Sequence, residues 1–224
     1  LMIKLVFEKM GWEVVGRQQY PTGSSDFSAG LMKAKAKGAQ VILPIFDMPQ
    51  SGILVKQWKT MHIPALMAGF ISPLAGPGAW KTFDGKIAGA MNCIFEIGNM
   101  PVPKVPKSVE FYEKYLKKYG KPIEAGHSPA PAYEMVYMLK EAIERAGSVN
   151  GDKVVAALEK TDRQGAMGRI KFGKDHQVIY GSNPEVEALG CMIQWQEPGK
   201  RVIVYPPSVA EGKIQLPEGL KSLK

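Results

Sequence analysis

The chain has 224 residues, of which 45% are apolar and 22% are charged, a composition typical of folded globular domains and not of disordered segments. Its longest apolar stretches are far shorter than the roughly 20 residues that a membrane-spanning helix needs. The formal net charge of +8 raises the question of a polyanionic partner. Because the lysines are dispersed along helices and are not interleaved with aromatic residues, we expect no nucleic-acid binding.

Residues 1–10 have the apolar periodicity of an amphipathic helix, carry charges within it, and contain no small-residue cleavage site. They therefore do not have the pattern of a secretory signal. We interpret the chain as the C-terminal part of a longer protein. A cut through a helix would expose core surface, so we expect a missing N-terminal portion, a partner fragment or a fragment-driven dimer.

Residues 11–72 contain two strand-helix units in succession, which is the alternation of an α/β fold. Short apolar strands that follow helices predict a parallel sheet with helices over both faces. Ligands of such sheets bind outside the carboxyl ends of the strands. In chain order we expect an extended run at 13–16, a turn at 20–26, a helix at 27–37, a strand at 41–45, a helix at 49–61 and a strand at 64–69.

The composition changes near residue 100, where the prolines of 101–106 cannot continue a strand ladder and predict a crossing between lobes. A strand-like run precedes this crossing at 91–97, and three helices follow it at 108–119, 131–146 and 151–160. Strands are expected again at 169–172, 189–196 and 201–205.

The helix expected at 131–146 has an apolar face formed by Ala132, Val136, Leu139, Ile143 and Ala146. Gly147 is expected to stop this helix, as glycines commonly do. Asn150 is expected to cap the next one.

No catalytic motif is visible, and the three histidines, His62, His127 and His176, stand far apart without Cys or carboxylate partners at metal-ligand spacing. We therefore expect neither an enzyme nor a metal or other cofactor. Cys93 and Cys191 each lie in a strand-like run, and two alternatives stay open for them: a disulfide, or two buried thiols.

The candidate binding residues follow two neighbouring strands at the point where each strand ends. They are Phe46 and Asp47 after the first strand, and Phe70, Ile71 and Ser72 after the second. Because these strand ends meet at one edge of the sheet, we expect the two groups to face one cleft. The alternatives are a helix cap for the carboxylate and core packing for the two phenylalanines.

Two further residues, Tyr133 and Ser128, lie at the start of a helix that we expect to return along this cleft and to line its other side. A packed tyrosine and a serine cap are the alternatives. Asp26, just before an apolar-periodic helix, has the pattern of a structural N-cap.

Several segments, taken in their order and spacing, resemble the second lobe of type I solute-binding proteins, the branched-chain amino-acid (Leu/Ile/Val-type) receptors of bacterial ABC importers. The resemblance covers nearly the whole chain. The segments are GWEVVG at 11–16, YP at 20–21, DFS at 26–28, PQSG at 49–52, KQ at 56–57, AYEMVY at 132–137, AIERAG at 142–147, VVAAL at 154–158, GRIKF at 168–172 and VIVYP at 202–206.

This resemblance implies a two-lobed type I periplasmic-binding-protein fold with parallel, doubly wound sheets and an incomplete first lobe. The implied division is 1–99 for the second lobe, 100–165 for the helical part of the first lobe, 166–206 for a return to the second lobe and 207–224 for a tail. The implied function is an extracytoplasmic receptor, periplasmic or extracellular, that captures a small molecule for a membrane ABC permease. An effector-binding sensor domain of the same fold is the alternative.

The candidate residues depart from the family pattern in one respect. Amino-acid-binding members usually place an aromatic residue where Asp47 falls and an acidic residue near Phe70, so the two types are exchanged in this chain. The exchange argues against an ordinary α-amino acid as the ligand, so an amide, an aromatic acid or another small polar compound is as open as an amino acid.

Overall fold

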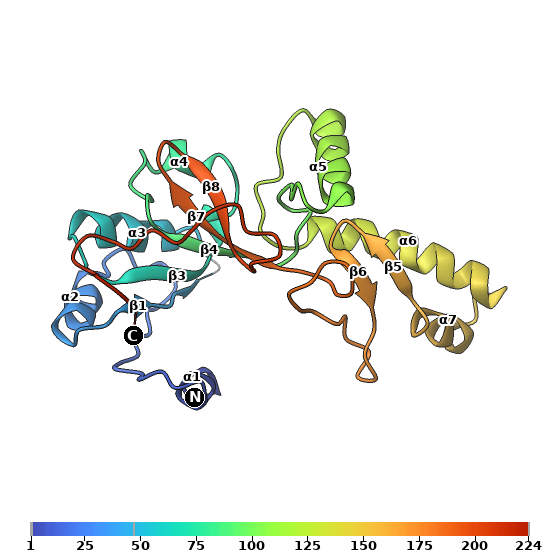
Figure 1. Ribbon diagram of the computed structural model, residues 1–224, viewed down its shortest axis with the longest axis horizontal. Coiled ribbons are helices and arrows are strands. Elements are labelled where there is room, and N and C mark those ends of the chain that lie inside the picture. Colours follow the sequence, from blue (N-terminus) through green and yellow to red (C-terminus); the bar gives the residue numbers. More distant parts are fainter. Residues whose placement is uncertain (1, 47, 224) are drawn as a thin grey trace.

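The computed structural model describes residues 2–46 and 48–223, which form two bodies joined by two crossings of the chain (Figure 1). The sheet body holds the mixed sheet and the helices α2, α3 and α4, and the helical body holds α5, α6 and α7 with a two-stranded hairpin. The helix α1 (Met2–Lys9) lies apart at the N-terminal end. Within the described residues no helix has the length and apolar character needed to span a bilayer.

The main sheet has the strand order β1-β3-β4-β7-β8, with β2 also paired to β3. Its first part is parallel, because β1, β2 and β4 all run in the direction of β3, whereas β7 and β8 are antiparallel additions. The predicted parallel α/β sheet is thereby confirmed, with an antiparallel edge. The strands are β1 (Val41–Ile42), β2 (Ile45–Phe46), β3 (Leu66–Ile71), β4 (Met91–Ile94), β7 (Cys191–Gln196) and β8 (Lys200–Tyr205).

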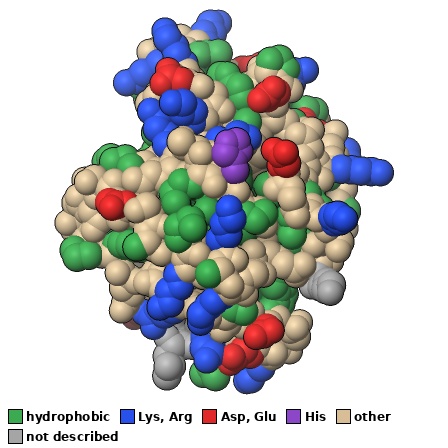
Figure 2. Space-filling model, turned by 90° about the vertical axis from the view of Figure 1, so that its left-hand side faces the viewer, with side chains coloured by type: hydrophobic (Ala, Val, Ile, Leu, Met, Phe, Trp, Pro, Cys, Tyr) green, Lys and Arg blue, Asp and Glu red, His purple; other side chains and the backbone are tan. Residues whose placement is uncertain are grey.

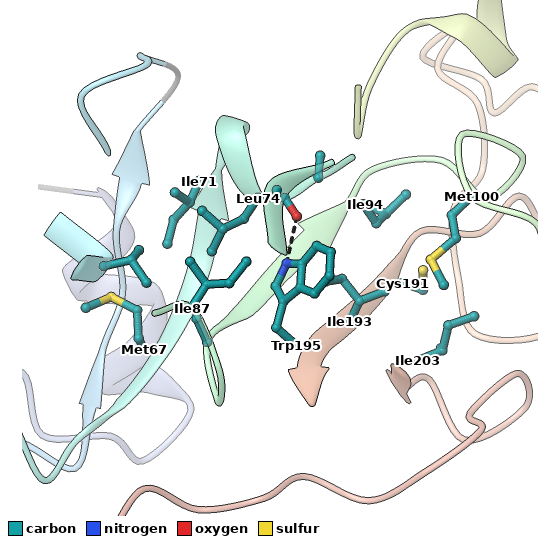
Figure 3. Close-up of a cluster of buried hydrophobic side chains, with 14 of the residues drawn as sticks. Met67, Ile71, Leu74, Ile87, Ile94, Met100, Cys191, Ile193, Trp195 and Ile203 are labelled. Atoms are coloured by element: carbon teal, nitrogen blue, oxygen red, sulfur yellow. Dashed lines mark hydrogen bonds between the residues drawn. The ribbon is translucent and has the colours of Figure 1, made fainter. Parts of the chain in front are cut away.

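Apolar side chains from strands and helices far apart in the sequence form one core in the sheet body (Figure 3). Trp195 on β7 is 1% exposed, and its indole N–H donates to the carbonyl of Leu74 over 3.0 Å. This hydrogen bond satisfies a polar group that would otherwise be costly to bury. The short elements around the core are α2 (Ser28–Ala36), α3 (Ser51–Thr60), the 3-10 helix η1 (Ser72–Leu74) and α4 (Ala79–Thr82).

The helical body has its own core, which α5 (Pro106–Tyr119), α6 (Pro129–Ala146), α7 (Gly151–Leu158) and the hairpin of β5 (Asp162–Gly165) and β6 (Gly168–Lys171) build together. Both long helices begin at a proline two residues before the predicted start. Proline suits the first turn of a helix because it has no N–H to leave unsatisfied there. As predicted, Gly147 ends α6 with φ near 58°, and the side chain of Asn150 caps α7.

The segment 166–188, which the resemblance places in a return to the second lobe, packs against the helical body in this structure. Ala166, Met167 and Ile170 belong to the same core cluster as Phe111 of α5. The chain reaches the sheet body only at Leu189, whose carbonyl accepts the backbone N–H of Ile97 over 2.9 Å.

Two expected strands differ from the structure. Residues 12–21, all within the described part of the chain, pair with no strand, so the run at 13–16 was wrongly predicted as the first strand of the sheet. The strand predicted at 41–45 is divided into β1 and β2 by Pro44, which lacks the N–H of a ladder. The carbonyl of Pro44 still accepts the N–H of Phe70 over 3.0 Å, so the path of the strand continues.

The apolar face predicted on α6 is only partly covered. Its C-terminal residues, Ile143 and Ala146, pack against the cluster formed with α7, whereas Val136 is 63% exposed and Leu139 is 44% exposed. The residues of α6 that the structure buries lie on the opposite face and include Glu134, Met138 and Ala142. The described residues therefore leave the middle of one apolar face of α6 open to solvent.

The C-terminal segment after residue 205 has no helix or strand within its described part, as predicted, and is held to the sheet by glutamine side chains. Gln194 is fully buried and exchanges two hydrogen bonds with the backbone of Gln215, at 2.8 and 2.7 Å. A side-chain amide in this arrangement replaces a strand partner, since it offers one donor and one acceptor as a peptide group does.

Candidate functional site

The carboxyl ends of β2, β3 and β4 lie together, as the parallel register requires, at the edge where the chain crosses between the bodies (Figure 1). Phe46 is paired with Ile71, and Ile45 with Phe70. Because side chains alternate along a strand, Phe46 and Phe70 emerge on opposite faces of the sheet. The residues predicted after the two strands therefore lie at one edge of the sheet, but the rings of Phe46 and Phe70 do not contact each other.

Phe46 lies in an aromatic group with Tyr20 and Phe27, at centroid distances of 6.4 and 5.7 Å. This group borders an open pocket of about 200 Å³. The other predicted residue of this strand end, Asp47, lies outside the described residues. The lining residues of the pocket are Tyr20, Pro21, Thr22, Gly23, Ser24, Phe27, Ile45, Phe46, Met48 and Gln50.

Phe70 lies in a second group, the hinge aromatic cluster, which we define as Phe70, Phe95 and His127. The ring centroids of Phe70 and Phe95 are 4.8 Å apart, and those of Phe95 and His127 are 5.5 Å apart, both at steep angles. Phe95 is 41% exposed, and His127 is exposed. Three rings that stay partly open to solvent where the two bodies join form an apolar surface of the kind that lines small-molecule sites.

Sequence reasoning missed Phe95 and His127. The strand-like run at 91–97 placed Phe95 inside a strand, whereas β4 ends at Ile94. Phe70 was selected because it directly follows the end of a predicted strand. The same rule would have selected Phe95 if the strand had been predicted to end at Ile94. His127 carried no local signal, because only the return of the chain brings it beside Phe95.

Ile71 and Ser72 continue from Phe70 but differ in accessibility. Ile71 is fully buried in the sheet core, and its backbone N–H donates to Oδ1 of Asn92 over 2.7 Å. Ser72 begins the 3-10 helix η1 and is half-buried. In this conformation, therefore, the hydroxyl of Ser72 is more available to a ligand than the side chain of Ile71.

Tyr133 lies in the helical body, where its ring is 4.7 Å from that of Phe111 and 5.0 Å from that of Tyr137. The hydrogen bond with Tyr137, followed by burial, raises the pKa of Tyr133 to about 12. The structure does not bring this ring to the hinge aromatic cluster. Ser128 is exposed at the start of α6, with φ near 85°.

Asp26 has a structural role, but it is not the predicted N-cap, because the N-cap residue of α2 is Phe27. Its carboxylate accepts the backbone N–H of Ser28 over 2.9 Å and the hydroxyl of the same residue over 2.6 Å. These hydrogen bonds to the charged form lower the pKa of the Asp26 carboxyl. The contacts fix the start of α2.

Both cysteines are free thiols. They lie on the neighbouring strands β4 and β7, but Cys93 is paired with Met192, and Cys191 with Ile94. Their side chains therefore emerge on opposite faces of the sheet, which excludes a disulfide in this register. Among the described residues no group of three or more His, Cys, Asp or Glu side chains is arranged to hold a metal ion.

Basic side chains are spread over the end of the sheet body that faces away from the helical body (Figure 2). They alternate there with hydrophobic and acidic side chains and form no continuous patch. The dispersion expected from the sequence is thus visible on this face.

The two α/β bodies and the crossings between them define the fold class of this chain. The family profile described as periplasmic binding protein matches residues 2–183, and the chain belongs to this family. The family is one of solute-binding proteins.

Relatives of known name agree with this assignment. The Leu/Ile/Val-binding protein homolog 8 of Brucella melitensis biotype 1 is 28% identical over 215 residues, which are 92% of this chain and 50% of that protein. Homolog 7 of Brucella suis biovar 1 is 28% identical over 220 residues, which are 94% of this chain and 52% of that protein. The chain thus spans about half the length of the curated relatives it matches.

Solved structures share the fold. A leucine binding protein from Thermotoga maritima MSB8 aligns with a TM-score of 0.68 at 22% identity, over 88% of this chain and 52% of that one. A solute binding protein from R. palustris in complex with benzoate aligns with a TM-score of 0.68 at 12% identity, over 97% and 55% of the two chains.

Proposed function

We propose that this chain carries the solute-gripping surface and the hinge of an extracytoplasmic receptor, which captures a small molecule between two lobes and presents it to a membrane ABC permease. The observation that carries the proposal is the hinge aromatic cluster, partly exposed where the bodies join. Closure about a hinge is a common way to enclose a ligand between domains.

The proposed contacts in this conformation are Phe70 and Ser72, which follow from the sequence, with Phe95 and His127 added. The other sequence candidates, Phe46, Asp47, Ile71 and Tyr133, are proposed as contacts only of the closed, ligand-bound form. Phe70 and Phe95 would hold the apolar part of the ligand. His127 would offer a hydrogen bond through its Nε2, because its Nδ1 is 2.7 Å from Glu96. Small-molecule sites typically combine apolar walls with a few such polar groups.

The proposed ligand is an amino acid, an amide or an aromatic acid. Relatives support this range, since their names include Leu/Ile/Val-binding proteins and a benzoate complex. An apolar wall with one hydrogen-bonding group accepts branched and planar side groups alike, so the aromatic cluster by itself does not favour one of them.

A thermal-shift series tests the proposal with L-leucine, L-isoleucine, L-valine, benzoate and benzamide. A ligand at 100 times its Kd stabilises the folded state by about 2.7 kcal/mol. For a chain of this size, that corresponds to a rise in Tm of roughly 5–10 °C. We expect at least one compound to produce such a rise, and Phe95→Ala to reduce its affinity at least tenfold.

The matched control is Tyr119→Ala, which removes an exposed aromatic side chain from α5, away from the strand ends. It should leave the Tm rise unchanged. If no compound of the three classes changes the Tm, or if both variants weaken binding equally, the proposed receptor site is wrong.

A further inference from the structure

Both crossings between the bodies, and the loop that joins α5 to α6, meet beside the end of β4. The backbone N–H of Phe95, on the first crossing, donates to the carbonyl of Gly126 in that loop over 2.8 Å. Two residues later, the N–H of Ile97 donates to the carbonyl of Leu189 on the second crossing over 2.9 Å. The first crossing thus lies between the loop and the second crossing, and its side chains can reach both.

Glu96 lies between these two backbone contacts, and its side chain points into the junction. The residue is 4% exposed, and its carboxylate has three partners from different directions. Nδ2 of Asn99 donates over 2.9 Å, the backbone N–H of Ser128 donates over 3.3 Å, and Nδ1 of His127 lies at 2.7 Å. A buried carboxylate needs such partners, because burial without them is expensive.

Asn99 extends the same contact into the helical body. It is 1% exposed, and its Oδ1 accepts the backbone N–H of Ala130 over 2.8 Å. The carboxylate of Glu96 accepts a hydrogen bond from Nδ2 of Asn99. This contact orients the side-chain amide of Asn99 so that its oxygen faces Ala130. The carboxylate and the amide together therefore occupy both free N–H groups at the entry to α6.

The helix α6 has no cap of its own. Ser128 is its N-cap residue but makes no side-chain cap hydrogen bond. Pro129 and Pro131 have no N–H, so the donors at this end are few, and those of Ser128 and Ala130 are both taken by the first crossing. A negative charge at this position is also favoured by the dipole of an 18-residue helix.

We propose that Glu96, acting with Asn99, is the positioning residue of the hinge, because it caps α6 from the first crossing and thereby sets how the helical body sits against the sheet body. The same carboxylate holds His127, so the geometry of the hinge aromatic cluster depends on it. The part that Glu96 plays in closure rests on the proposed receptor function, whereas its restraint of the α6 entry does not.

Amide hydrogen exchange of the chain tests this restraint without any ligand. In Glu96→Ala both carboxylate oxygens are removed, so the donors of Asn99 and Ser128 lose their acceptor. We expect the amides of Ser128 and Ala130 to exchange at least tenfold faster, while those of Ile193 and Trp195 in β7 keep their rates. Small-angle scattering should show a broader distribution of interatomic distances, as the bodies become less restrained.

The matched control is Glu187→Ala, which removes a carboxylate that also accepts backbone N–H groups, those of Ser182 and Asn183, within one local loop. It should leave the exchange at Ser128 and Ala130 unchanged. Glu96→Asp, which keeps the charge but shortens the reach, serves if the first variant does not fold, and should accelerate the same two amides to a smaller extent.

Two results would overturn the proposal. One is unchanged exchange at Ser128 and Ala130 in the Glu96 variants. The other is an equal acceleration throughout both bodies, which would mean that the carboxylate contributes only to general stability. Neither result depends on a ligand, so a failure of this inference is distinct from a failure of the proposed function.

Discussion

Individual buried polar groups in this protein are satisfied by partners far away in the sequence. The indole of Trp195 reaches the carbonyl of Leu74, and the buried Asn92 amide oxygen accepts the N–H of Ile71. Such contacts contribute little net stability when formed but cost the full desolvation penalty when one partner is lost. Single substitutions at these residues should therefore have large effects.

Trp195→Phe should lower the free energy of unfolding by about 2–4 kcal/mol, because it leaves the Leu74 carbonyl without a donor and opens space beside Trp80. Urea unfolding followed by circular dichroism measures the change. Trp12→Phe is the control, since this tryptophan is 39% exposed and should change stability by less than about 0.5 kcal/mol. Equal losses would mean that the Trp195 hydrogen bond is absent in solution.

The two thiols make the free energy of unfolding decrease at alkaline pH. Burial, and to a smaller extent the Glu96 carboxylate, raises the pKa of Cys93 to about 11. Burial raises the pKa of Cys191 to about 12. An unfolded thiol titrates near 9. Their contribution to stability is therefore complete below pH 9 and is lost as the pH rises through 11, because only the unfolded state loses these protons in that window.

A double variant, Cys93→Ala with Cys191→Ala, should show a smaller decrease in Tm between pH 9 and 11 than the wild type. Tyrosines and lysines titrate in both proteins, so the difference between the two slopes isolates the thiols. Identical slopes would contradict the burial of the thiols. The wild-type thiols should also resist iodoacetamide at pH 8 until the chain is unfolded.

At the scale of the elements, α6 and the β5–β6 hairpin are joined by a buried ion pair. Nε of Arg163 donates to Glu134 over 2.7 Å, and the other oxygen of that carboxylate accepts the N–H of Ala166 over 2.6 Å. Arg163 also pairs with Glu141 and lies over the ring of Tyr137. The pair fixes the hairpin at one position along the helix.

Arg163→Ala should destabilise the protein by about 3–5 kcal/mol, because it leaves the buried Glu134 carboxylate without its cation. The same hairpin offers a control, Arg169→Ala, which breaks an exposed pair with Asp162 and should cost less than about 1 kcal/mol. Thermal or urea unfolding of both variants checks the contrast. Similar losses would show that burial does not distinguish the two pairs.

At the scale of the whole molecule, one face of α6 exposes two apolar side chains, Val136 and Leu139, to solvent. The double change Val136→Glu with Leu139→Glu should alter the free energy of unfolding by less than about 1 kcal/mol, because both side chains are exposed. Met138→Glu, on the buried face of the same helix, should cost more than about 3 kcal/mol. If the double variant is as unstable as Met138→Glu, this face is covered in solution, and a sedimentation experiment would identify a second copy.

The fold could be predicted well from the sequence where local patterns carry the information. Hydrophobic periodicity predicted α2, α3 and the three helices of the helical body within about two residues. Two further details followed from local chemistry: glycine in the left-handed region ends α6, and the side chain of Asn150 caps α7. The run at 13–16 was wrongly predicted because strand propensity does not by itself provide a partner strand.

Only part of the candidate site could be predicted from the sequence. Parallel strands end at a common edge, so the position of Phe70 and Ser72 at the carboxyl end of β3 follows from the strand pattern. Which face each ring occupies depends on register, and a change of one residue reverses it. The separation of Phe46 from Phe70 could therefore not be read from the chain.

The α/β class, the order of the helices and the common edge at which the parallel strands end could be read from the sequence, because these depend on periodicity and turn residues near one another in the chain. The contacts of the hinge follow only from the folded arrangement. Phe95 meets His127, and Glu96 caps α6, across 31 or 32 positions of sequence. Such contacts leave no local pattern, because only the crossings of the folded chain bring these residues together.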